Sequence, residues 1–259
     1  MVTPLCDTLH SGTKGLMVPH MSETHVLDKA LLAELARGAE KVFENADALY
    51  REASVLRDYG ALNRALFLYQ VSLEECAKVE MLGAWATSLL MGHEVDSTKV
   101  KNAMASHANK NRTNAYFLKG DSKEEAAKQV GDVEEAIKAF KEMQKEFHLR
   151  ANKAKNGSLY VDFVDGTFVA PNERITLEMV NEIAALDEEF LGLSFPKIKM
   201  LRRWAVNPES IRDEIAGFEK RINELRDEYL DDPVKAMEIL LQEMLEHRLE
   251  IEEKKRNKK

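Results

Sequence analysis

Charged side chains interrupt one apolar stretch of the chain in a pattern that could do chemistry. Residues 72–80 contain Glu74, Glu75, Lys78 and Glu80 among apolar neighbours. At helical spacing, Glu75 and Glu80 are expected to be buried, whereas Glu74 and Lys78 can pair along the helix. A buried carboxylate must pair, accept hydrogen bonds or take up a proton. The stretch is therefore either a structural ion-pair cluster or a polar functional site between helices.

A histidine lies on a second helical stripe. Val100, Met104 and His107 recur at spacings of four and three, and Lys110 and Asn114 continue the stripe as polar residues. Such a histidine is either a core residue with satisfied hydrogen bonds or a proton-transfer group. The two segments together supply the candidate site residues Glu75, Lys78, His107 and Lys110.

Basic and amide side chains gather near this histidine and on the next predicted helix. They can meet a phosphate backbone or an acidic partner, or they can form an ordinary solvated face. The set comprises Arg112, Asn114, His148, Arg150, Lys153 and Lys155.

Several familiar site motifs are absent. The sequence has no glycine-rich phosphate loop, dinucleotide fingerprint, Gly-x-Ser-x-Gly elbow or His-Glu-x-x-His pair. No glutamate precedes a histidine by three residues, as the di-iron sites of helical bundles require. We therefore expect neither a metal nor a cofactor.

Long helices must position these residues. Apolar spacing predicts helices over residues 26–57 and 61–91, and the second is apolar nearly all round, which is typical of a buried helix. A third helix is expected from Ser97 to Phe117 and a fourth from Ser122 to about Lys153. The fold class is all-α, an up-down four-helix bundle.

The rest of the chain suggests a short extended segment and further helices. Residues 159–164 are aromatic and β-branched, and Asp165-Gly166 is a turn signal, so we expect an extended segment or small hairpin. Helical patterns resume at Thr176. We predict a disordered tail (1–24), the bundle (25–172) and a helical C-terminal extension with a charged end (173–259).

Composition agrees with a helical protein outside membranes. The 259 residues are 44% hydrophobic and 32% charged, with only 12 glycines and 6 prolines. The net charge of −8 argues against non-specific binding to nucleic acids or membranes, although a local basic patch is compatible with it.

Cys6 and Cys76 exclude a disulfide framework, and Cys76 is expected to be a buried thiol. Without a signal peptide or a membrane-spanning run, we expect a cytoplasmic protein.

The order of these segments resembles the AbiV family of bacterial abortive-infection proteins, a branch of the all-helical HEPN superfamily. The resemblance covers about residues 40 to 190. It rests on residues 64–68 and 74–78, on His107-Ala108-Asn109-Lys110, and most specifically on residues 156–163 followed by Ala170-Pro171.

This resemblance implies a phage-defence effector that arrests the infected cell. Many HEPN proteins are metal-independent ribonucleases that act as homodimers through an Arg-x4–6-His motif, in which histidine transfers protons and arginine stabilises phosphorane charge. The chain lacks that motif, because no arginine stands at the required spacing before any of its seven histidines. The nearest arrangement is reversed, with Arg112 five residues after His107. A divergent site would use Glu75, Lys78, His107 and Lys110 as catalytic residues. RNA or a partner would be bound by Arg112, Asn114, Arg150, Lys153, Tyr160 and Asp162.

Three hypotheses follow. The first is an effector that acts on RNA or translation, with cleavage of RNA by a divergent ribonuclease site as one route, and with RNA, the ribosome or a phage activator as partner. The second is a non-catalytic helical module that binds a phage or ribosomal protein through its surface. The third is a structural helical protein in which the polar cluster specifies packing alone.

Overall fold

The computed structural model describes residues 27–118 and 120–229, together with Ile239 and Glu243. The predicted disordered tail (1–24) and the charged C-terminal end lie outside the described residues. The chain divides after Val206 into two compact units.

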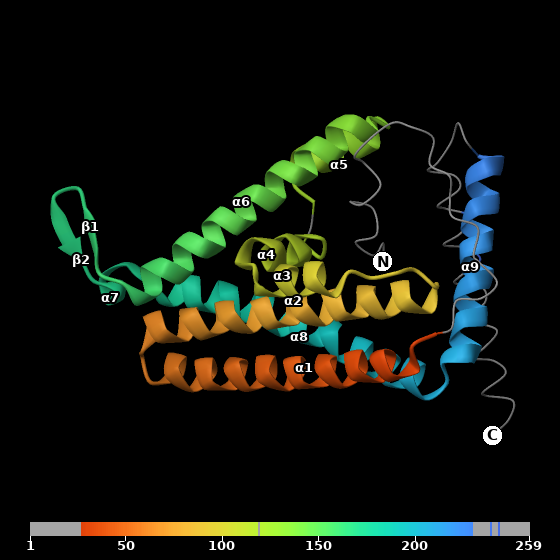
Figure 1. Cartoon of the computed structure of the whole chain (residues 1–259). Helices are drawn as coiled ribbons and strands as arrows, with labels where there is room; N and C mark the ends of the chain where they lie inside the picture. Colours follow the sequence, from red (N-terminus) through yellow and green to blue (C-terminus); the bar gives the residue numbers. More distant parts are fainter. Residues whose placement is uncertain (1–26, 119, 230–238, 240–242, 244–259) are drawn as a thin grey trace, which may run out of the picture. The chain divides into compact units, whose positions relative to one another are not determined.

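Three long helices form the core of the first unit. α1 (Lys29–Asp58) and α2 (Leu62–Leu90) confirm the first two predicted helices, and α8 (Leu177–Val206) packs against both. Figure 1 shows the three lying side by side. Gly60 permits the tight turn between α1 and α2, because its φ of +85° suits a residue without a side chain. The compact unit extends to Val206, so it includes α8 in addition to the segment 25–172 predicted as the bundle.

α2 is the buried centre of this unit, as its apolar circumference predicts. Tyr69 and Leu73 are fully buried and belong to two core clusters that α1, α2 and α8 build together. Tyr69 also fixes the α1–α2 contact through a 2.8 Å hydrogen bond to Ser54. Cys76 is a buried free thiol, as expected.

The third and fourth predicted helices are each broken in two. The third consists of α3 (Ser97–Ala105) and α4 (His107–Ala115), because Ser106 has an extended backbone and its hydroxyl caps α4. The fourth consists of α5 (Ser122–Gln129) and α6 (Val133–Leu159). Here Gly131 has a φ of +73°, and the Asp132 carboxylate caps α6 through the Glu135 amide.

α6 leads from α5 to a small β-hairpin. It packs against α2 and α4 as well as α5, and Figure 1 shows it crossing obliquely over the bundle. β1 (Asp162–Val164) and β2 (Thr167–Val169) pair antiparallel, confirming an extended segment at this point, and α7 (Pro171–Arg174) returns the chain to α8. The fold is all-α with this one hairpin among the described residues.

The second unit contains α9 (Pro208–Glu228). Its proline stands in the first turn, where no backbone N–H is needed. Arg221 of α9 binds the carboxylate of Glu243 at 2.6 Å. No described helix of either unit is long and apolar enough to cross a membrane.

Candidate functional site

A buried carboxylate, Glu74, forms the centre of the candidate site. It lies in α2, and its side chain is only 2% exposed. The Lys110 ammonium from α4 lies 2.7 Å from Oε2, and the Lys155 ammonium from α6 lies 2.7 Å from Oε1. His107, the first residue of α4, places Nδ1 2.5 Å from Oε2. Three separate helices thus meet at one carboxylate.

The neighbouring cations keep Glu74 ionised. Burial alone would raise the pKa of this carboxyl, but hydrogen bonds from Lys110, Lys155 and His107 outweigh burial and hold the pKa below its usual range. Both lysines are themselves buried. Two ammonium groups therefore share one carboxylate, so this group, which we call the Glu74 cluster (Glu74, His107, Lys110 and Lys155), carries net positive charge.

The hydrogen bonds at His107 determine which ring nitrogen is free. Nδ1 lies 2.5 Å from the Glu74 carboxylate and 3.0 Å from the Lys155 ammonium. A carboxylate only accepts and an ammonium only donates, so Nδ1 cannot satisfy both. The shorter contact assigns the proton to Nδ1, which donates to Glu74. In the neutral imidazole, Nε2 then carries the lone pair, on a side chain that is 57% exposed. This arrangement suits a histidine that accepts a proton from a bound molecule.

The structure brings together part of the predicted site. His107 and Lys110 meet, as the helical stripe indicated, but the carboxylate between them is Glu74 and not Glu75. Glu75 is paired with Lys78 one turn along α2. The expected pairing of Glu74 with Lys78 is wrong, because Glu74 faces α4 and α6.

Lys155 is the member of the Glu74 cluster that sequence analysis missed. It was grouped with the exposed basic residues, yet α6 buries it between the buried residues Ala151 and Ser158. Small residues one turn before and after a lysine were the available signal, since they let a neighbouring helix approach the lysine stem.

Two buried asparagines hold α4 beside the site. The Asn114 amide donates to the Leu73 carbonyl of α2 at 2.8 Å, and the Asn111 amide lies 3.2 Å from Nδ1 of His148 on α6. Asn114 had been predicted to contact RNA or a partner, but it is fully buried. Its amide holds α4 against α2.

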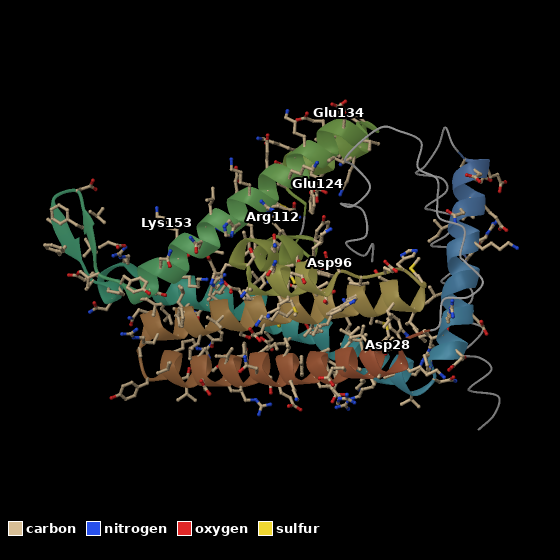
Figure 2. The ribbon with its side chains drawn as sticks, viewed as in Figure 1. Asp28, Asp96, Arg112, Glu124, Glu134 and Lys153 are labelled. Atoms are coloured by element: carbon tan, nitrogen blue, oxygen red, sulfur yellow. The ribbon has the colours of Figure 1, made fainter. Side chains whose placement is uncertain are left out.

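The remaining predicted binding residues lie at the surface. Arg112, Arg150 and Lys153 are exposed, and Figure 2 shows Lys153 projecting from the last turns of α6. Tyr160 follows α6 and is exposed, whereas Asp162 pairs with Arg174 at 2.8 Å. Among the residues that the structure describes, no group of three or more His, Cys, Asp and Glu side chains could hold a metal ion.

Comparison with known proteins identifies relatives of this chain. The family model HEPN_AbiV, described as AbiV, matches residues 34–192. The protein y4gJ of Sinorhizobium fredii, described as uncharacterized, is 46% identical over 111 residues. The match covers 43% of this chain and 58% of that protein. No solved structure matches the chain.

Proposed function

The chain belongs to the AbiV family of the HEPN superfamily, and we propose that it is an abortive-infection effector that cuts RNA with His107 as its catalytic base. The observation that carries the proposal is the hydrogen bond from His107 Nδ1 to buried Glu74, which leaves Nε2 on an exposed side chain. The same carboxylate–histidine arrangement orients the proton-accepting imidazole in serine hydrolases.

The proposed reaction is cleavage by the neighbouring 2′-hydroxyl. His107 Nε2 removes the proton from that hydroxyl, and the 2′-oxygen attacks the adjacent phosphorus. The bond from phosphorus to the 5′-oxygen breaks, leaving a 2′,3′-cyclic phosphate and a 5′-hydroxyl end. The departing oxygen takes its proton from water, and the resulting hydroxide receives the proton held by His107.

The two lysines contribute charge to this reaction. Lys110 and Lys155 are buried against Glu74, so they act as positioning residues. Their shared positive charge favours the phosphate beside His107 and the negative charge that develops on it. The arginine of the superfamily's Arg-x4–6-His motif is missing here. The net positive charge of the Glu74 cluster would take over its role of stabilising negative charge on the phosphate.

Partners belong to the same proposal. A cytoplasmic effector of this kind would act on RNA or the ribosome, as a homodimer and under the control of a phage protein. The competing function is a non-catalytic module that binds a phage or ribosomal protein, and the absent arginine motif favours it. The two functions make different predictions for His107: a catalytic effector needs its imidazole for activity, whereas a binding module needs it at most for folding.

The test compares two histidine variants in cells. His107→Ala and His93→Ala both remove an imidazole, but His93 lies exposed beyond the end of α2. We expect His107→Ala to abolish growth arrest and new RNA ends, measured by sequencing 5′ ends after induction, while His93→Ala keeps both. Circular dichroism checks that both variants fold. Growth arrest by a folded His107→Ala protein would refute catalysis by His107 and favour the binding module.

A further inference from the structure

Two phenylalanine rings lie exposed on one face of the β1–β2 hairpin. Phe163 and Phe168 are opposite each other in the strand register, with ring centroids 4.9 Å apart. Their side chains are 65% and 77% exposed, and the preceding Tyr160 and Val161 are also exposed. Grouped apolar side chains of this size on a surface mark a binding site more often than isolated ones do.

Arg174 braces the opposite face of this hairpin. Its guanidinium donates to the Asp162 carboxylate at 2.8 Å and to the Val169 carbonyl at 2.9 Å. Asp162 and Val169 are the register pair next to the phenylalanines, so their side chains lie on the other face of the hairpin. The aromatic pair is thus held in place before anything binds, which lowers the entropy cost of binding.

Charge around the hairpin base favours a polyanion. Residues 147–161 include three basic residues, Arg150, Lys153 and Lys155, and no acidic residue. Residues 97–118, which contain α3 and α4, include four basic residues and no acidic residue. These two segments are positive in a chain whose net charge is −8. Of the basic residues in these segments, Lys110 and Lys155 are buried against Glu74, whereas Arg150 and Lys153 are exposed on α6, the helix that leads into the hairpin.

We propose that Phe163 and Phe168 stack on unpaired bases of single-stranded RNA whose phosphates follow the basic end of α6 to the Glu74 cluster. Aromatic faces stack on any base, but the bases of a duplex are already covered by their neighbours. Lys155 connects the two regions, because it belongs to the Glu74 cluster and lies in the last turns of α6. This inference rests on the proposed function and names its substrate class.

The test is binding of the full-length protein to a fluorescein-labelled 2′-O-methyl RNA strand, followed by anisotropy. The methyl group blocks attack by the 2′-oxygen, so binding is measured without cleavage. We expect the single strand to bind more tightly than its duplex. The double variant Phe163→Ala/Phe168→Ala should weaken single-strand binding by about tenfold or more, as loss of base stacking does. Arg150→Gln should lower the slope of log affinity against log salt by about 0.7.

Two matched variants separate stacking from folding. Val164→Ala trims a side chain on the opposite face of the same strand and should leave affinity unchanged. Phe163→Trp keeps an aromatic face and should retain binding. Equal affinity of the wild type and the double alanine variant, or equal binding of duplex and single strand, would overturn the inference. So would loss of growth arrest with unchanged RNA affinity, because the hairpin would then serve a protein partner.

The outcome for the hairpin is distinguishable from that for His107. If the double alanine variant of the hairpin binds RNA as well as the wild type does, and His107 is still needed for cutting, only the stacking inference is contradicted. If the hairpin phenylalanines are needed for RNA binding, and the His107→Ala variant remains fully active, only the proposed catalysis is contradicted.

Discussion

Asp187 of α8 should make folding stability fall as pH rises. It is fully buried, and its Oδ1 lies 2.9 Å from the Ser72 hydroxyl, which also lies 2.9 Å from the Ala46 carbonyl. One hydroxyl proton cannot serve two acceptors. If Ser72 donates to Ala46, Asp187 must itself carry a proton and donate it to Ser72. Burial raises the pKa of Asp187 to about 8, so the carboxyl is protonated in the folded chain at neutral pH.

The size of the effect follows from the difference between the folded and unfolded pKa. The ordinary aspartate pKa is 3.8, and burial raises it to about 8 in the folded protein. Between these values the unfolded chain has lost a proton that the folded chain keeps bound. Stability therefore falls with pH by up to about 1.4 kcal/mol per unit, from about pH 4 to about pH 8. This loss competes with a total stability of roughly 5–15 kcal/mol.

The assay is urea unfolding of the wild type and Asp187→Asn at several pH values between 5 and 8. The asparagine amide can donate to Ser72 but does not ionise, so the variant should lack this pH dependence. We expect the wild type to lose about 1 kcal/mol per pH unit relative to the variant. Glu189→Gln, an exposed change on the same helix, is the control and should follow the wild type.

Parallel pH profiles for the wild type and Asp187→Asn would contradict the expected proton uptake by folded Asp187. Parallel curves would mean that Asp187 has the same protonation state in the folded and unfolded chains. A variant that is less stable by the same amount at every pH would show that asparagine disturbs packing without any linked proton.

Two substitutions and one labelling experiment test the buried groups of α2. Glu74→Gln should lower the urea-derived unfolding free energy by about 3 kcal/mol, because it leaves two buried ammonium groups unpaired. The difference should shrink as pH falls below about 4.5, because the unfolded chain then takes up a proton that folded Glu74 binds only at lower pH, and a pH-independent difference would contradict this. Glu80→Gln should lower the unfolding free energy at neutral pH by less than Glu74→Gln does, because burial raises the pKa of Glu80 in spite of Lys197, and an equal loss in the two variants would contradict this. Cys76 should react with a thiol reagent only after unfolding, because burial raises its pKa, and rapid labelling of native protein would contradict this.

The helices were predictable because apolar periodicity records which face each helix buries. The periodicity located α1 and α2 to within a few residues, and the all-round apolar pattern identified α2 as the buried helix. It did not reveal the breaks at Ser106 and Gly131, where the same spacing continues across each break. A single capping side chain or positive φ decides such breaks, and periodicity does not record it.

The candidate site was predictable in its residue types but not in its pairing. His107 and Lys110 follow from one stripe, whereas the choice between Glu74 and Glu75 is a rotation of about 100° on a helix apolar all round. Only the packing of α4 and α6 against α2 selects Glu74. Lys155 is far from His107 in the sequence, and only the small residues one turn before and after it, Ala151 and Ser158, distinguish it from the exposed Lys153.

His107, oriented by Glu74, is the residue that we propose cuts RNA. The most direct measurement is the cleavage rate of an RNA oligonucleotide by purified full-length protein in the presence of EDTA, with end analysis of the products. We predict that the wild type yields 2′,3′-cyclic phosphate ends and that His107→Ala lowers the rate by at least about a hundredfold, while a 2′-deoxy residue at the cut site abolishes cleavage. Cleavage by His107→Ala at the wild-type rate, or a wild-type protein that leaves RNA intact, would contradict the claim.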